Sequence, residues 1–285
     1  MVYKYKFIVY NIFVKIREMN KSRKELLTPP VLRKFNMASV NDASVCVFVG
    51  KPKTGKSFCV RDMCYHKRDF PIGRVMSGTE RSNGYYKDFV PQNLIGFSWS
   101  PKSCDNFFKR QEHITEKKRS DPDFKFIDPR GFFILDDLMA DVTWMNYKTI
   151  KETFMTGRHY HMLFVITMQY PLGIGPCLRA CVDYVFLFRE SIRSNRRRIY
   201  ENFAGMFDSF ELFCATMDKY TEHFGCIVIH NGSQSNRLED QIFCYKAEDH
   251  GPFKMCDQMI WDIAEADKQK KKKLAHQESL RTHRW

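Results

Sequence analysis

The sequence lacks the patterns that mark zinc-binding, secreted and membrane-spanning proteins. Its ten cysteines include no C-x-x-C pair, and Cys177 and Cys181 are followed by no His or Cys pair at zinc-binding spacing. No apolar run is long enough to span a bilayer. The apolar stretch 7–14 ends at Lys15 and Arg17 without a small-residue cleavage site, which argues against a signal peptide. We therefore expect reduced, mostly buried thiols in an intracellular protein.

Two further absences narrow the class of protein. The N-K-x-D motif with which GTPases recognise guanine does not occur, and no internal repeat is present. The composition is that of a globular protein, with 44% hydrophobic and 15% aromatic residues. The formal net charge of +13 favours a polyanionic partner such as nucleic acid, although a basic surface that only keeps the protein in solution gives the same total.

A phosphate-binding loop is the most specific motif. The stretch 45–57 reads VCVFVGKPKTGKS and fits G-x-x-x-x-G-K-[ST]. The glycines let backbone N–H groups turn toward phosphate oxygens, Lys56 would reach the β- and γ-phosphates, and the Ser57 hydroxyl would hold Mg²⁺. A helix expected over 57–66 would point its positive end at the anion. The residues expected to bind ATP are Gly50, Lys51, Pro52, Lys53, Thr54, Gly55, Lys56, Ser57 and Phe58.

Continuous apolar runs predict strands that are buried on both faces of a parallel sheet. They alternate with helical stretches, which indicates an α/β fold with a mainly parallel central sheet flanked by helices. The expected strands are 45–49, 74–77, 94–99, 132–135, 161–166 and 184–188, with a late pair at 226–230 and 242–245. The expected helices are 57–66, 85–89, 104–118, 144–156 and 202–219.

Polar residues follow two of these strands, where nucleotides bind in open α/β sheets. Asp136 and Asp137 follow 132–135, and Gln169 comes shortly after 161–166. Asp136 is expected to hold Mg²⁺ together with Ser57, and Asp137 to orient or deprotonate the attacking water. Gln169 could contact the γ-phosphate or that water. A capping role for Asp137 and an ordinary polar strand end at Gln169 are the structural alternatives.

Basic residues elsewhere leave several interpretations open. Arg158 could act as an arginine finger on a neighbouring subunit, contact DNA phosphate, or pair with a carboxylate of its own chain. The arginine-rich stretch 193–198 could contact DNA or form a solvated loop. We divide the chain into an N-terminal extension (1–40), a P-loop domain (41–257) and a charged helix with a basic tail (258–285). That tail is either solvated or a non-specific contact for nucleic acid or acidic protein.

Four segments, in order, resemble those of one family. They are GKPKTGKS, FFILDDLMAD, FMTGRHYHMLFVITMQYPLGI and DYVFLFRE. The resemblance covers about residues 43–250 and is most specific where Gly157-Arg158-His159 is followed, beyond an apolar strand, by Gln169. The family is that of the poxvirus-type virion DNA-packaging ATPases of nucleocytoplasmic large DNA viruses, in the FtsK–HerA superfamily.

The resemblance implies a P-loop NTPase of the ASCE/RecA-like type with ATP and Mg²⁺ as cofactors. It marks Lys56 and Ser57 as nucleotide residues, Asp136 and Asp137 as the Walker B pair, and Gln169 as the sensor. It further implies a homo-oligomeric ring, a pentamer or hexamer, that moves double-stranded DNA into a capsid through capsid or portal-vertex partners. The expected location is the virus factory in the host cytoplasm, or the virion. Many superfamily members have Glu where this chain has Asp137, which is one methylene shorter.

Three other functions are alternatives to the packaging motor. A P-loop nucleoside or nucleotide kinase would use the arginines of 193–198 as a phosphate-closing lid, but the Asp136-Asp137 pair and Gln169 argue against it. A different DNA translocase would share the same motifs. A nucleic-acid-binding protein with an inactive site is disfavoured because Lys56 and Ser57 are intact beside the acidic pair.

Overall fold

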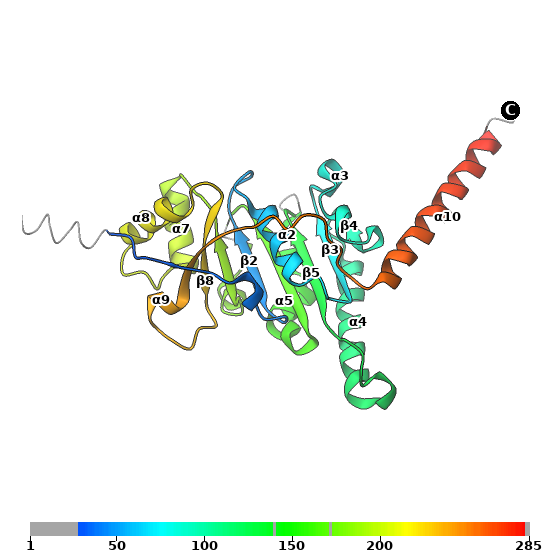
Figure 1. Cartoon of the computed structure of the whole chain (residues 1–285), viewed down its shortest axis with the longest axis horizontal. Coiled ribbons are helices and arrows are strands. Elements are labelled where there is room, and N and C mark those ends of the chain that lie inside the picture. Colours follow the sequence, from blue (N-terminus) through cyan, green and yellow to red (C-terminus); the bar gives the residue numbers. More distant parts are fainter. Residues whose placement is uncertain (1–27, 139–140, 171–172, 283–285) are drawn as a thin grey trace, which may run out of the picture.

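Four central strands are buried along their whole length, as their apolar sequences predict. The computed structural model describes residues 28–138, 141–170 and 173–282. In it the four strands are β2 (Val45–Val49), β5 (Gly131–Asp136), β6 (Met162–Met168) and β7 (Tyr184–Leu187). They form the middle of a nine-stranded sheet with the order β1-β9-β8-β7-β2-β6-β5-β3-β4 (Figure 1). The outer strands are β1 (Arg33–Lys34), β3 (Ile72–Ser77), β4 (Ile95–Gly96), β8 (Gly225–His230) and β9 (Ile242–Lys246).

The strand directions bring several distant segments to one edge of the sheet. Every neighbouring pair is parallel except for the two pairs that include β8. The carboxyl ends of β2, β5, β6 and β9 and the amino end of β8 therefore lie along the same edge. Because β6 lies between the P-loop strand β2 and the acidic strand β5, the order is that of the ASCE/RecA-like group. The predicted fold class is confirmed.

Helices cover both faces of this sheet because its strands are apolar on both sides. Alternate residues of β2 point to opposite faces: Val45, Val47 and Val49 belong to one core, and Cys46 and Phe48 to the other. Helix α2 (Lys56–His66) packs on the second face. The first face is covered by α4 (Pro101–Ser120), α5 (Lys148–Thr156), α7 (Arg193–Phe203) and α8 (Phe210–Tyr220).

Shorter elements connect these layers. The short α-helices are α3 (Glu80–Asn83), α6 (Pro176–Arg179) and α9 (Leu238–Gln241). The 3-10 turns are η1 (Met37–Ser39), η2 (Tyr86–Asp88), η3 (Gln92–Leu94), η4 (Pro122–Phe124), η5 (Val142–Asn146) and η6 (Gly157–Tyr160).

Four predicted elements differ in the structure. The helix expected over 85–89 is only the 3-10 turn η2, and the helix expected over 144–156 is divided at Tyr147 into η5 and α5. The helix expected over 202–219 is interrupted after Phe203, and α8 starts afresh after Ser209, whose hydroxyl accepts a hydrogen bond from the Leu212 N–H at 3.1 Å. The strand expected over 94–99 is reduced to β4, because the chain turns toward the start of α4 soon afterwards.

The segment before residue 41 contributes to the domain rather than only preceding it. β1 pairs with β9, and Phe35, Met37 and Val40 are buried in the core that also contains α2. The first 27 residues lie outside the described part of the chain. We propose that the P-loop domain begins before Leu32 and not at residue 41.

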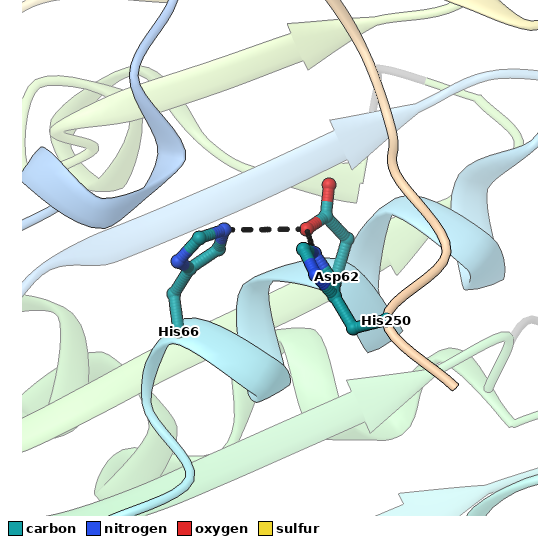
Figure 2. A group of neighbouring side chains, drawn as sticks. All are labelled: Asp62, His66 and His250. Atoms are coloured by element: carbon teal, nitrogen blue, oxygen red, sulfur yellow. Dashed lines mark hydrogen bonds and ion pairs between the residues drawn. The ribbon is translucent and has the colours of Figure 1, made fainter. Parts of the chain in front are cut away.

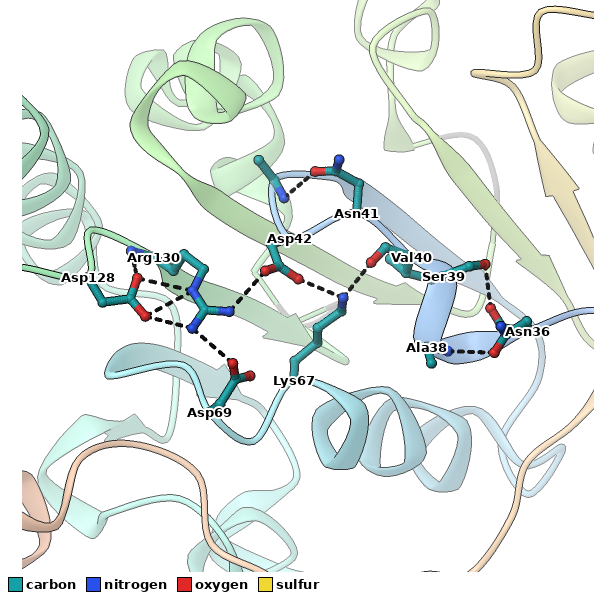
Figure 3. A network of polar contacts seen from close by, with 11 residues as sticks. Asn36, Ala38, Ser39, Val40, Asn41, Asp42, Lys67, Asp69, Asp128 and Arg130 are labelled. Carbon is teal, nitrogen blue, oxygen red and sulfur yellow. Dashed lines mark hydrogen bonds and ion pairs between the residues drawn. The ribbon is translucent and has the colours of Figure 1, made fainter.

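A network of charged side chains lies at the edge of the sheet opposite the P-loop (Figure 3). Arg130, just before β5, lies 2.9 Å from Asp42, 2.9 Å from Asp69 and 2.6 Å from Asp128. Lys67, at the end of α2, lies 2.6 Å from the other oxygen of Asp42. The network joins the segment before β2, the α2–β3 connection and the loop before β5.

The chain after β9 crosses the outer side of α2 and ends in a long helix (Figure 1). Backbone hydrogen bonds from Met255 to Phe89 and from Asp257 to Pro71 hold this crossing segment in place. Helix α10 (Gln258–Thr282) then projects away from the body of the molecule. Among the described residues, no helix is both long and apolar enough to cross a membrane.

Candidate nucleotide site

The P-loop connects β2 to α2 and has the backbone shape that its glycines predict. Gly55, which precedes the first helical residue, has φ +100°, and Lys53 has φ +64°. A Cβ on Gly50 would lie 2.6 Å from the Cβ of Phe188, so only glycine fits there. The loop therefore wraps around the amino end of α2, where backbone N–H groups favour an anion.

Lys56 lies inside this loop. Its ammonium group donates hydrogen bonds to the carbonyl oxygens of Gly50 at 2.5 Å and Lys51 at 2.8 Å. Burial lowers the pKa of Lys56, whereas the nearby carboxylates of Asp137 and Asp136 oppose that shift. A buried cation held by carbonyl oxygens and facing two carboxylates is suited to meet phosphate oxygens.

The first acidic residue, Asp136, is buried at the end of β5 and held by two hydroxyl groups. Thr167 donates to its Oδ1 at 2.6 Å, and Ser77 donates to its Oδ2 at 3.1 Å. Burial raises the pKa of Asp136, and these two hydrogen bonds counteract the shift. Each carboxylate oxygen keeps a further lone pair. Together with the Ser57 hydroxyl, this oxygen set fits a hard cation such as Mg²⁺.

The second acidic residue, Asp137, is positioned from three sides. Its N–H donates to the Thr167 hydroxyl at 3.0 Å, and the amide of Gln169 donates to its Oδ1 at 2.9 Å. Its carbonyl oxygen packs against Gly78, where a Cβ would lie only 2.6 Å away. The structure thus brings Gln169 to the acidic pair, and Thr167 links the two aspartates. No motif in the sequence points to that role for Thr167.

A cleft of about 640 Å³ opens over these residues. The predicted residues that line it are Pro52, Lys53, Gly55, Lys56, Ser57, Phe58, Asp136 and Asp137. The other lining residues are Thr79, Asn83, Thr167, Phe224, Lys246 and Ala247. Thr79 follows the strand expected over 74–77, where polar residues are expected beside the nucleotide. Phe224 immediately precedes β8, and Lys246 is the last residue of β9. Only the strand order could reveal their proximity, because both are far from the P-loop in sequence.

Three other predicted loop residues support the P-loop without lining the cleft. Lys51 forms an ion pair at 2.7 Å with Glu190, which is buried just after β7. Thr54 donates a hydrogen bond to the Lys51 carbonyl at 2.7 Å. The third residue, Gly50, provides the close contact to Phe188. The contacts with Glu190 and Phe188 fasten the loop to the segment that follows β7.

Arg158 lies away from the cleft of its own chain. It belongs to η6, before β6, whereas Gln169 follows the same strand. A seven-residue strand spans about 23 Å, so Arg158 is at the opposite edge of the sheet. One guanidinium nitrogen lies 3.9 Å from Asp183, and its side chain is 46% exposed. The contact with a carboxylate of its own chain is thus present, and the side chain remains accessible from outside.

The arginines of 193–198 lie on helix α7 rather than in a loop. Arg193 and Arg196 form ion pairs with acidic residues of α8 at 3.1 and 2.5 Å. Arg197 and Arg198 are exposed, and the guanidinium of Arg198 lies 5.1 Å from the ring centre of Tyr170, the residue after Gln169. Arg193 and Arg196 therefore have a structural role, and the guanidinium of Arg197 lies 3.9 Å from the ring centre of Phe210 on α8. Arg198 faces solvent beside Tyr170 at the nucleotide edge.

Proteins of similar sequence come from large DNA viruses. The chain is 38% identical over 212 residues to the uncharacterized protein L437 of Acanthamoeba polyphaga mimivirus, covering 74% of each protein. It is 33% identical over 214 residues to the uncharacterized protein 088R of Invertebrate iridescent virus 3, covering 74% of this chain and 79% of that protein. No family model matches the chain.

A solved structure of similar fold is the genome packaging NTPase B204 of Sulfolobus turreted icosahedral virus 2 in complex with ATP-γS. The TM-score is 0.47 at 14% identity, over 73% of this chain and 98% of that one. Because this similarity is weak, the function is inferred from the residues of the chain itself. The chain belongs to the family of large-DNA-virus proteins that includes L437 and 088R, and its own motifs resemble those of the poxvirus-type DNA-packaging ATPases.

Proposed function

We propose that the protein is an ATP-hydrolysing motor that moves double-stranded viral DNA into a capsid. The observation that carries this proposal is the hydrogen-bonded group of Asp136, Thr167, Asp137 and Gln169 beside the P-loop lysine. It supplies a phosphate-binding cation, oxygen ligands for a metal and a carboxylate beside an amide within one cleft. The relatives in DNA viruses and the net charge of +13 support DNA as the polyanion that is moved.

Each residue has a separate task in this proposal. Lys56 binds the β- and γ-phosphates, and the N–H groups at the start of α2 bind their remaining oxygens. Ser57 and, through water, Asp136 would hold Mg²⁺, which when bound neutralises charge that develops on the phosphates. Asp137 orients or deprotonates the attacking water, and Gln169 fixes the direction in which that carboxylate points.

The base of the nucleotide would lie against aromatic side chains of the same cleft. Phe58, one residue after the motif, and Phe224 both line it, and their side chains are partly exposed. Aromatic faces bind a purine by stacking. We therefore assign Phe58 and Phe224 to the base and Lys246 to the outer phosphates or the ribose.

The DNA and the ring of subunits are the finer parts of the proposal. Arg197 and Arg198 on α7 would contact DNA phosphates without reading sequence. The contact of Arg198 with Tyr170, beside Gln169, would then connect the DNA to the nucleotide site. The working form would be a ring of five or six subunits at a capsid or portal vertex, in the virus factory of the host cytoplasm or in the virion.

The test is steady-state ATP hydrolysis with and without long duplex DNA. We expect the DNA to raise ATP turnover, and we expect moderate salt to remove that stimulation because it depends on phosphate contacts. Lys56→Ala should abolish turnover under both conditions. Lys102→Ala changes an exposed lysine at the start of α4 and should leave turnover unchanged.

Two outcomes would contradict the proposal. ATP turnover that is indifferent to DNA but coupled to phosphorylation of a nucleoside or nucleotide would indicate a kinase. The second outcome is a protein that forms rings on DNA and binds nucleotide but hydrolyses no ATP, with or without DNA. That result would indicate an inactive site.

A further inference from the structure

A second group of potential ligands lies on the outer side of α2, where the chain that follows β9 crosses the helix. It consists of Asp62 and His66, one helical turn apart, and His250 (Figure 2). The His250 Nε2 lies 2.6 Å and the His66 Nε2 lies 3.4 Å from the same oxygen, Oδ1 of Asp62. One ligand atom from each residue lies within 4.8 Å of the other two.

The other oxygen of Asp62 is already occupied, which fixes the orientation of the carboxylate. Its Oδ2 accepts hydrogen bonds from the Tyr245 hydroxyl at 2.5 Å and from the Glu248 N–H at 3.1 Å. The Asp62 side chain has no exposed surface. Partners of this kind around a ligating carboxylate are the usual outer support of a metal site. They leave only Oδ1 directed at the two imidazoles.

The separations of the two imidazoles from the carboxylate are close to those of a transition-metal site. Ligands bound tetrahedrally at about 2.0–2.1 Å lie roughly 3.4 Å apart. The separation of His66 and Asp62 already has this value, and that of His250 and Asp62 needs to widen by less than 1 Å. The His250 ring is stacked on Tyr65 at 3.8 Å, which holds its plane. The imidazoles are 25% and 16% exposed, so water can reach a fourth position.

We infer that Asp62, His66 and His250 bind one divalent transition-metal ion of the zinc class, separate from the Mg²⁺ of the nucleotide. Two imidazoles and one carboxylate suit such an ion, whereas Mg²⁺ prefers oxygen ligands alone. The ion fastens the segment 245–250 to the P-loop helix. Because Lys246 and Ala247 of this segment line the nucleotide cleft, the ion also fixes one wall of that cleft.

The test is metal binding by the full-length protein after a chelator has removed bound metal. Zn²⁺ is titrated by calorimetry, and Co²⁺ is used as a spectroscopic probe. We expect one equivalent of each and a Co²⁺ visible spectrum typical of nitrogen and oxygen ligands. His66→Gln and His250→Gln keep a side chain that can donate to Asp62, so the fold is retained while the affinity falls by about tenfold or more.

Controls separate this site from other metal-binding groups. His113→Gln changes an exposed histidine on α4 and should leave the affinity unchanged. Cys181→Ser tests the thiols of Cys177 and Cys181, which lie four residues apart. Binding that is lost in Cys181→Ser, or a thiolate charge-transfer band with Co²⁺, would overturn the proposal. So would the absence of stoichiometric binding, or an affinity that neither His66→Gln nor His250→Gln changes.

Discussion

Asp137 adopts a backbone conformation that few residues other than glycine adopt. Its φ of +48° lies in the left-handed region, which costs on the order of 1 kcal/mol for a residue with a Cβ. Hydrogen bonds from its N–H to Thr167 and from Gln169 to its carboxylate offset that cost. Strain that is held in place by neighbours is common at reactive sites. We interpret it here as the means by which a side chain one methylene shorter than Glu is placed beside the water.

Thr167 should therefore matter for chemistry more than for binding. In Thr167→Val the Asp137 N–H loses its acceptor and Asp136 loses its shortest hydrogen bond. We expect kcat to fall about 10- to 100-fold, which corresponds to roughly 1.4–2.8 kcal/mol. The nucleotide Kd should change by less than about threefold, because Lys56 and the loop are untouched. Single-turnover hydrolysis and titration with a fluorescent nucleotide measure the two effects.

The pH–rate profile and a conservative variant test whether loss of the Thr167 hydroxyl causes the fall in kcat. The Thr167 hydrogen bond lowers the pKa of Asp136, so its loss should move the acid limb of the pH–rate profile to higher pH. Thr167→Ser keeps the hydroxyl and should retain kcat within about threefold. A serine variant as slow as the valine variant would mean that the methyl group, and not the hydroxyl, is needed.

At the scale of elements, the sequence predicted the individual strands and helices that depend on a local pattern of residues. The runs 45–49 and 132–135 are fully apolar, and 161–166 is apolar after His161. They became β2, β5 and β6, with Gln169 beside the acidic pair. The strand order is not encoded locally, so the sequence could not place Phe224 or Lys246 in the cleft.

Other elements were missed because their determinants are either weak or distant. The break before α8 was hidden because hydrophobic residues with helical spacing occur on both sides of it. His250 lies 188 residues from Asp62, and nothing in either segment predicts the other.

The charge network at the opposite edge should make stability depend on pH. Burial raises the pKa of Asp42 and of Asp128, but hydrogen bonds from Lys67 and Arg130 to Asp42 and from Arg130 to Asp128 outweigh it, so both values lie below normal. This stabilisation is present above the normal carboxyl pKa of about 3.9 and is lost as the pH falls through the lowered folded-state values. Arg130→Met should reduce the free energy of unfolding by about 1–2 kcal/mol at neutral pH, since exposure of the carboxylates screens the pairs.

Urea unfolding between pH 7 and pH 2.5 tests this expectation. The difference in free energy of unfolding between the wild type and Arg130→Met should become smaller as the pH falls below about 4. Lys148→Met removes an exposed i,i+4 pair with Glu152 and should cost less than about 0.5 kcal/mol at any pH. If the loss in free energy of unfolding caused by Arg130→Met is the same at every pH, the cause is lost packing on Phe70. The ring centre of Phe70 lies 5.0 Å from the guanidinium.

The two edges of the sheet carry different groups of residues. The nucleotide cleft occupies one edge, and Arg158 lies at the other, about 23 Å away along β6. In a ring, however, the second edge of one subunit can approach the cleft of the next. Arg158 can therefore act on a nucleotide only in another subunit, and any effect within its own chain must be structural.

Mixing two inactive variants distinguishes these roles. We expect Arg158→Ala and Asp137→Asn each to have little DNA-stimulated turnover. In an equal mixture, a site is restored when an intact Asp137 faces an intact Arg158 from the neighbour. Random assembly gives this combination at about one quarter of the interfaces, so turnover should recover to roughly a quarter of the wild-type value. DNA-stimulated ATP hydrolysis, measured against the mixing ratio, gives the result.

The matched control uses two residues that act in the same cleft. Lys56→Ala mixed with Asp137→Asn cannot restore any site, because both side chains serve the nucleotide bound by their own subunit. Recovery in the Arg158→Ala mixture alone would show that the nucleotide lies at a subunit interface. If neither mixture recovers turnover, Arg158 acts within its own chain through its contact with Asp183. The Asp183 carboxylate also accepts a hydrogen bond from the Val45 N–H at 2.8 Å, so this contact would hold the starts of β2 and β7 together. In that case Arg158→Ala should lower the stability of the isolated subunit, whereas a residue that acts only between subunits should leave it unchanged.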